Sequence, residues 1–178
     1  MQQETTRSPW IWEHAQDNSA RFVLGTRGQN PLVCFGINPS TAVPGAPDPT
    51  VKRLMSFARD NGYDRWTMIN IYPQIATDPN DMDREHRADL KSENERHIAA
   101  LLAGRPLTLL AAWGNLIAKR PYLKSLLADL VMISAAARCD WVSLGAPTRQ
   151  MHPRHPLYVK GGTPLQSFDM DEYLRRLE

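Results

Sequence analysis

The sequence predicts a three-layer α/β/α protein whose sheet of about four to five strands is mainly parallel, with one antiparallel strand near the N-terminus. Short apolar segments alternate with segments of helical periodicity along most of the chain. The 178 residues suffice for one well-buried core, and 42% hydrophobic with 22% charged residues is the balance of a globular protein. We therefore expect one domain over residues 1–178, with residues 1–18 as an N-terminal extension.

Short apolar segments bounded by turn-forming residues are the predicted strands. They cover residues 20–24, 32–37, 66–71, 107–113 and 141–144. Residues 131–134 are a further candidate. The connection between the first two strands is rich in turn formers, so these strands are expected to pair antiparallel.

Helical segments alternate with the later strands. Asp48 and Pro49 supply an N-cap and a first-turn proline for a helix that runs to about Asn61. Three later helices are predicted over residues 84–102, after Gly114 and over residues 169–177. This alternation implies right-handed crossovers and a sheet covered on both faces. In such sheets, ligands bind beyond the carboxyl ends of the strands.

Composition limits the class of protein. A formal net charge of +2 neither requires nor excludes a nucleic-acid partner. Cys34 and Cys139 lie far apart in apolar segments, which indicates buried thiols in a reducing compartment rather than a disulfide or a metal centre. Apolar runs stay below about 18 residues, so we expect no membrane segment. The expectation is a cytoplasmic monomer without a cofactor.

The first polar segment after a predicted strand is Gly36–Ala42. Pro39 limits the backbone there, so the amide of Asn38 and the hydroxyls of Ser40 and Thr41 can face a ligand. The alternative is a turn in which the Asn38 side chain only caps the backbone.

Two further strand ends carry candidate residues. Asn70 ends one strand, where its amide can form hydrogen bonds with both a donor and an acceptor of a planar ring. An ordinary polar residue at a strand end explains the sequence equally well. Trp113 ends another strand, and the predicted helix begins after Gly114, where the glycine lets a ligand approach the backbone closely. Trp113 is either a core residue or a stacking platform.

A proline-stiffened loop carries two histidines three positions apart, His152 and His155. Pro153 and Pro156 break any helix that would align them, and no carboxylate or cysteine is near, so a metal site is not expected. We expect the loop to present one histidine to a ligand.

The same loop is basic. The segment Gly145–Lys160 contains Arg149, Arg154 and Lys160 and no acidic residue, which suits phosphate contacts. The alternative is a solvated basic loop.

The chain resembles a bacterial and phage family of unknown function over roughly residues 20–160. The shared motifs are Asn-Pro-Ser-Thr-Ala at residues 38–42, Asp-x-Thr with a following arginine at Asp48, Thr50 and Arg53, and Pro-Arg-His-Pro-Leu-Tyr at residues 153–158. This likeness implies a family and no activity.

More distantly, the chain is similar to the uracil-DNA glycosylase superfamily, in particular the mismatch-specific uracil/thymine glycosylases. The matching segments, in order, are Gly36–Pro39, Asn70 with Asp78–Asn80, Leu110–Gly114 and His155–Leu157. The resemblance implies a uracil-DNA glycosylase-like fold.

The glycosylase resemblance also implies roles for site residues. Asn38 would position the water that attacks the sugar, Asn70 would bind a flipped base, and His155 would stabilise charge on the leaving base. Asp48 is a candidate general base or merely the helix cap. The candidate base- or nucleotide-binding residues beside Asn70 are Phe35, Tyr72, Trp113, Ser40 and Thr41. The candidate phosphate-binding residues are Arg53, Arg149, Arg154 and Lys160.

Departures from the glycosylase motifs widen the range of functions. Ser40 replaces a glycine, no Ser-Pro follows His155, and no carboxylate directly follows Pro39. The leading hypothesis is hydrolysis of the N-glycosidic bond of a flipped normal, damaged or modified pyrimidine in single- or double-stranded DNA. The alternatives are a non-catalytic base, nucleotide or DNA-binding module, and an enzyme that acts on a base substituent or on a free nucleoside or nucleotide.

Overall fold

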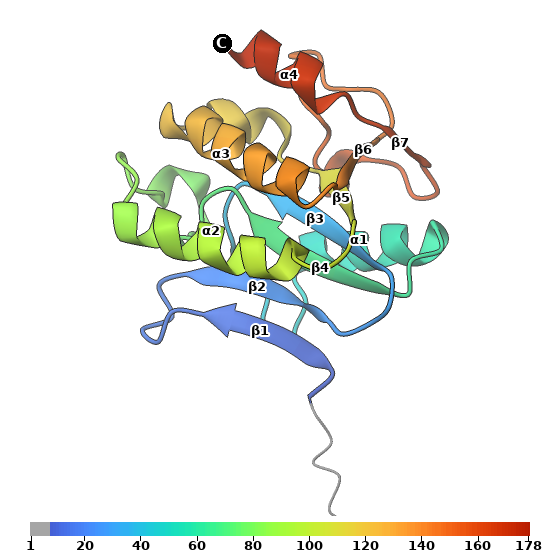
Figure 1. Ribbon diagram of the computed structural model, residues 1–178, viewed down its shortest axis with the longest axis horizontal. Coiled ribbons are helices and arrows are strands. Elements are labelled where there is room, and N and C mark those ends of the chain that lie inside the picture. The colour runs from blue at the N-terminus through green and yellow to red at the C-terminus, as the bar shows by residue number, and fades with distance from the viewer. Residues whose placement is uncertain (1–7) are drawn as a thin grey trace, which may run out of the picture.

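The computed structural model describes residues 8–178, which form an α/β structure around one mixed sheet (Figure 1). The strands are β1 (Trp10–His14), β2 (Arg21–Thr26), β3 (Pro31–Gly36), β4 (Arg65–Asn70), β5 (Thr108–Ala111), β6 (Asp140–Leu144) and β7 (Leu165–Ser167). They lie in the order β1-β2-β4-β3-β5-β6-β7.

The centre of the sheet is parallel and its two edges are antiparallel. β4, β3, β5 and β6 run parallel, with Gly36 opposite Asn70 and Phe35 opposite Ala111. β1 and β2 add antiparallel strands at one edge and β7 adds one at the other. The sheet is thus mixed rather than mainly parallel. Its four parallel strands direct their carboxyl ends to the same edge.

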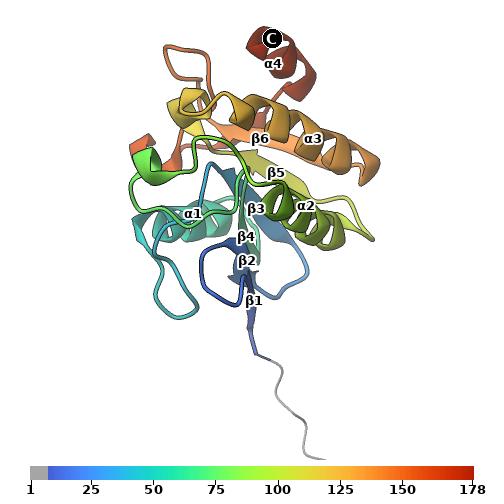
Figure 2. The same ribbon diagram turned by 90° about the vertical axis from the view of Figure 1, so that its left-hand side faces the viewer.

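Helices cover both faces of the sheet. They are α1 (Pro49–Asp60), α2 (Ala88–Leu102), α3 (Tyr122–Ala136) and α4 (Met170–Leu177), with 3₁₀ turns η1 (Pro79–Asp81), η2 (Gly114–Ala118) and η3 (Pro156–Tyr158). α1 packs on one face, while α2 and α3 pack on the other (Figure 2). Each face therefore has its own apolar core, and each fully buried leucine-sized side chain contributes about 1.5–3 kcal/mol.

The α1 helix forms as its sequence predicts. The Asp48 carboxylate accepts a hydrogen bond from the Val51 amide at 2.9 Å, and Pro49 occupies the first turn. Leu54 and Phe57 are buried against the sheet. Gly62, at φ +81°, follows the helix in the left-handed conformation that ends it.

The five main predicted strands are confirmed, but the predicted pairing of the first two and the further candidate strand at residues 131–134 are wrong. β2 and β3 do not pair, because β4 lies between them. The connection that was expected to form a hairpin is held instead by the Asp64 carboxylate, which accepts from the amides of Gln29 and Asn30. Residues 131–134 belong to α3 rather than to a strand.

The helix predicted over residues 84–102 begins only at Ala88. Arg120 donates hydrogen bonds to the carbonyl oxygens of Asn80, Met82 and Asp83, which holds the preceding segment as a loop. Because these contacts span about 40 residues of sequence, local periodicity does not reveal them.

The predicted N-terminal extension, residues 1–18, lies partly outside the described residues, which begin at residue 8. Within it, residues 10–14 form the edge strand β1. Cys34 is buried as expected, whereas Cys139 is only half-buried. None of the helices formed by residues 8–178 is long and apolar enough to cross a membrane.

Candidate functional site

A cleft of about 760 Å³ lies at the carboxyl edge of the parallel strands. Its lining includes six of the predicted site residues: Asn38, Ser40, Thr41, Asp48, Trp113 and His155. A smaller inner pocket of about 70 Å³ shares Asn38, Ser40, Asp48 and His155 with the cleft. The segments that follow β3 and β6, far apart in sequence, thus meet in one site.

The Asn38 side chain is fixed by its own loop. Its amide nitrogen donates to the carbonyl oxygens of Pro39 at 3.0 Å and Ala76 at 2.8 Å. Both amide hydrogens are therefore used, and this assigns the amide orientation. The side-chain oxygen accepts no hydrogen bond from residues 8–178, so Asn38 offers the cleft an acceptor.

Asp48 has two functions available in this geometry. One carboxylate oxygen caps α1 through the Val51 amide, as described above. The other oxygen accepts no hydrogen bond within the described part of the chain, and Asp48 lines both the cleft and the inner pocket. The helix cap and a role toward a ligand are compatible in one side chain.

His155 reaches the cleft at the start of η3. Its Nδ1 accepts a hydrogen bond from the Leu157 amide at 3.2 Å, so the neutral ring carries its proton on Nε2. Burial lowers the pKa of His155 below its usual value, and the nearby charge of Asp48 opposes this shift. At neutral pH His155 is therefore an uncharged hydrogen-bond donor.

Arg21 is a site residue that the sequence analysis missed. It lies at the start of β2, is only 2% exposed, and lines the inner pocket. Its Nη1 donates to the Ala42 carbonyl at 3.0 Å, while its buried Nε has no partner. Nothing in the apolar segment around Arg21 distinguishes it, because its position depends on the loop that follows β3.

Asn70 ends β4 beside the inner pocket but lines neither cavity. The side chain is 1% exposed, and neither its oxygen nor its nitrogen has a partner. A Cβ at Gly36 would lie 2.9 Å from the Asn70 oxygen, so the glycine makes room for this amide. The structure therefore buries Asn70 beneath the site rather than presenting it to a ligand.

The aromatic residues expected as stacking platforms, Phe35, Tyr72 and Trp113, are core residues. All three side chains are fully buried. Phe35 packs on Trp141 with ring centroids 4.9 Å apart. The Tyr72 hydroxyl donates to Asp83 at 2.8 Å. None of these three rings is available to stack on a base, because none of the side chains has exposed surface.

His152 is held by a buried hydrogen-bond chain. The Trp113 indole nitrogen donates to the Tyr173 hydroxyl at 2.9 Å, and this hydroxyl lies 2.9 Å from His152 Nδ1. The chain ties α4 to the loop that carries His155. His152 is thus a structural residue, and within residues 8–178 no group of three or more potential metal ligands is formed.

Two of the four residues assigned to phosphate make internal contacts. Arg53 donates to the carbonyl oxygens of Pro156 and Val159 and lies 4.9 Å above the Phe57 ring. Arg154 Nε donates to the Ala146 carbonyl at 2.8 Å. Both arginines hold the loop that carries His155.

The other two basic residues, Arg149 and Lys160, are exposed and free to meet a phosphate. Trp113 and Tyr158 both belong to the cleft lining, but Trp113 is fully buried, whereas Tyr158 is 78% exposed at the rim. Leu157, 41% exposed, lies next to it. The sequence contained a signal for Tyr158, since it ends the Pro-Arg-His-Pro-Leu-Tyr motif.

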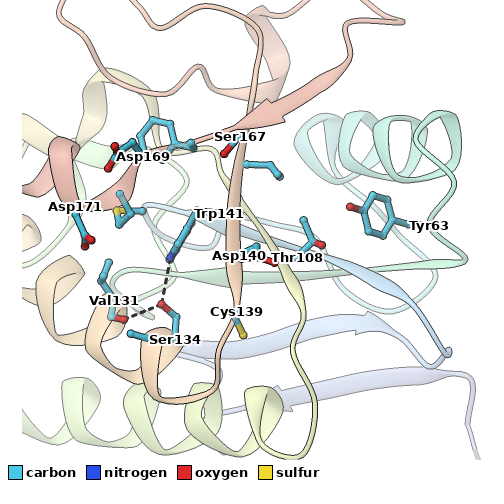
Figure 3. A pocket seen from close by; sticks show the side chains of 14 residues that line it. Tyr63, Thr108, Val131, Ser134, Cys139, Asp140, Trp141, Ser167, Asp169 and Asp171 are labelled. Atoms are coloured by element: carbon cyan, nitrogen blue, oxygen red, sulfur yellow. Dashed lines mark hydrogen bonds between the residues drawn. The ribbon is translucent and has the colours of Figure 1, made fainter.

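A second depression, of about 610 Å³, lies at the amino ends of β5 and β6 (Figure 3). Asp140, Asp169 and Asp171 contribute to its lining, as does Cys139, but none of the predicted catalytic, base-binding or phosphate-binding residues does. The Trp141 indole nitrogen donates to Ser134 Oγ there at 3.2 Å. Because the predicted site residues gather at the carboxyl-edge cleft instead, that cleft is the better candidate site.

A family described as "Protein of unknown function (DUF1643)" matches residues 21–157. The chain belongs to the DUF1643 family. The match contains Arg21, Asn38, Asp48 and His155, and so includes the residues that line the inner pocket. Comparison with curated proteins and with solved structures found no match. The expected membership of a family of unknown function is confirmed, and the likeness to uracil-DNA glycosylases stays a prediction.

Proposed function

We propose that this DUF1643 protein binds a pyrimidine nucleotide unit in the carboxyl-edge cleft and hydrolyses its N-glycosidic bond. The observation that carries the proposal is the convergence of Asn38, Asp48 and His155 on one cleft. The cleft volume of about 760 Å³ is within the range of small-molecule sites and admits a nucleotide.

The three side chains have complementary roles in this reaction. The Asn38 oxygen and the free Asp48 oxygen accept hydrogen bonds from a water molecule, and Asp48 takes the proton as the water oxygen bonds to C1′. The C1′–N bond breaks, and its electron pair leaves with the base. The Nε2–H of His155 donates to the base oxygen that gains this charge, which is worth roughly 10²–10³ in rate for one such donor.

Tyr158 supplies the aromatic surface in this account. It is exposed at the cleft rim, beside His155, with ring centroids 5.8 Å apart. Stacking of one base on an aromatic side chain is worth about 1–3 kcal/mol. Tyr158 therefore takes the part that the sequence analysis assigned to Phe35, Tyr72 and Trp113.

The test is release of free base. Single- and double-stranded oligonucleotides that contain uracil, mismatched thymine or modified pyrimidines are incubated with the protein, and free bases are measured by mass spectrometry. We expect the wild-type protein to release base from at least one substrate. In His155→Gln the rate of this release should fall by at least about 100-fold. Met132→Gln, at a 72% exposed position of α3, is the matched control. Absence of product from every substrate would reject the hydrolase.

A free nucleoside or nucleotide is the second candidate substrate. It is favoured by the internal contacts of Arg53 and Arg154, which leave Arg149 and Lys160 as the exposed cations of the loop. A protein that neutralises several DNA phosphates loses affinity steeply with salt, whereas a nucleoside complex hardly responds. Titration calorimetry from 50 to 200 mM salt separates the two substrates, provided that each affinity is measured to within about a factor of two.

A binding module without turnover is the third candidate. It is favoured by the helix-capping role of Asp48, which explains this carboxylate without any chemistry. The module would be supported if the wild-type protein binds a nucleotide tightly without forming product and Asp48→Asn binds it with the same affinity. Measurable turnover by the wild-type protein would reject it.

A further inference from the structure

Arg21 is a buried charge without an ionic partner. The side chain is 2% exposed, its Nε has no hydrogen bond, and one carbonyl oxygen, that of Ala42, accepts from Nη1. Among residues 8–178, no carboxylate forms an ion pair with it. Asp48 is close enough to favour the charged form but does not contact the guanidinium.

This arrangement is costly for folding. Burial of an unpaired charge costs several kcal/mol, and an apolar side chain of similar volume at such a position is often neutral or stabilising. Burial lowers the pKa of Arg21 to about 10, so the guanidinium is still protonated at neutral pH. Stability alone thus gives no reason for an arginine at this position, and unpaired buried charges of this kind are typical of functional positions.

The surroundings of Arg21 favour an anion. The inner pocket is also lined by Ser40, by Thr50 in the first turn of α1 and by His155, whose Nε2 carries a proton. Helix N-termini favour negative charge. Asp48 is the one acidic residue of the lining and opposes an anion, but its helix-capping oxygen already accepts from Val51.

The size of the inner pocket limits what enters it. Its volume of about 70 Å³ is roughly a tenth of that of the cleft, about 760 Å³. A compact group of a few heavy atoms suits this space better than a whole base, which the larger cleft accommodates. Carboxylate and phosphate groups have this size, and both match the planar donor fork of arginine.

We propose that the inner pocket binds an oxyanion of the ligand, with the Arg21 guanidinium as its charge partner. The rest of the ligand then occupies the larger cleft, which shares Asn38, Asp48 and His155 with the pocket. The oxyanion is either the phosphate of a nucleotide or a carboxylate on a pyrimidine ring. The proposal concerns binding and does not depend on bond hydrolysis.

The experiment compares wild type with Arg21→Met, whose side chain is apolar and of similar length. Thermal unfolding and titration calorimetry are carried out at constant ionic strength with two matched pairs of probes. Uridine is compared with uridine 5′-monophosphate, and uracil with uracil-5-carboxylate. Inorganic phosphate serves as the third anionic probe.

We expect at least one anionic probe to bind and stabilise wild type more than its neutral counterpart. Arg21→Met should lose about 10- to 100-fold in affinity for that probe, as expected for a hydrogen bond to a charged group. Without probe, its melting temperature should equal or exceed that of wild type. A response to the nucleotide identifies phosphate as the oxyanion source, and a response to uracil-5-carboxylate identifies a ring carboxylate.

Two results overturn the proposal. One is wild-type protein that no anionic probe stabilises beyond its neutral counterpart. The other is an Arg21→Met protein that binds the anions as wild type does. If Arg21→Met fails to fold, the Arg21 Nε–H signal of the wild-type protein is followed by NMR, assigned through Arg21→Lys. A signal that every anionic probe leaves unchanged likewise overturns the proposal, and a shift with one of them supports it.

Discussion

Gly114 lies directly against His155. A Cβ added to Gly114 would be 3.3 Å from the Cβ of His155, and the Gly114 amide donates to the Pro153 carbonyl at 2.9 Å. Gly114 also has φ +59°, in the left-handed region that favours glycine. The turn after β5 thus sets the position of the loop that carries His155.

The first prediction concerns this contact. Gly114→Ala should lose about 1–2 kcal/mol of unfolding free energy through its positive φ, and should also displace His155. Gly62→Ala is the matched control, because Gly62 has φ +81° but nothing within 4 Å of its added Cβ. Urea unfolding and the imidazole NMR signals of His155 measure the two effects. Equal effects of both substitutions on His155 would contradict the relationship.

The second prediction separates the two roles of Asp48. Asparagine is as good an N-cap as aspartate, so Asp48→Asn should keep nearly all the unfolding free energy, whereas Asp48→Ala should lose about 1 kcal/mol. Base release should fall strongly in both variants, since neither carries a carboxylate. Full activity of Asp48→Asn would show that the carboxylate serves only α1.

The third prediction concerns pH. Because burial lowers the pKa of His155, the unfolded chain binds more protons than the folded protein below about pH 6.5. His155 therefore leaves stability intact above that pH and reduces it as the pH falls toward the folded pKa. The unfolding free energy of wild type should decline more steeply below about pH 6.5 than that of His155→Gln, by at most about 1.4 kcal/mol per pH unit. Parallel curves of the two proteins from pH 8 to 5, measured by urea unfolding, would contradict a partly buried, neutral His155.

The fourth prediction concerns Arg53. Its guanidinium joins α1 to the loop that carries His155, so Arg53→Lys should lose about 1–2 kcal/mol of unfolding free energy without altering the salt dependence of ligand binding. The double variant Arg149→Gln/Lys160→Gln should keep the unfolding free energy but reduce the salt dependence of binding, if DNA is the partner. A reduced salt dependence in Arg53→Lys would show that this arginine meets phosphate instead.

The strands and helices that depend on local sequence could be predicted. The Asp48–Pro49 start of α1 and the apolar strands β3, β4 and β5 are examples, because caps, turns and periodicity are short-range signals. The position of β4 between β2 and β3 could not be predicted, since it depends on contacts such as that of Asp64 with the connection before β3.

The site was predictable where a residue follows a parallel strand. Asn38 and His155 were found in this way, because the carboxyl ends of parallel strands meet at one edge. Arg21 was missed because it lies at the amino end of an antiparallel strand. Asn70 and Trp113 also follow the strand-end rule, but their side chains point into packed interior, which sequence position alone does not show.

The measurement that tests the account most directly is an NMR titration of the side-chain signals of Asn38 and His155. The probes are 2′-deoxyuridine 5′-monophosphate and a short uracil-containing oligonucleotide. The account predicts an Nε2–H tautomer for His155, with probe-induced shifts at both side chains and none at the depression lined by Ser134 and Asp140. Shifts confined to that depression, or no shift at Asn38 and His155 with either probe, would contradict it.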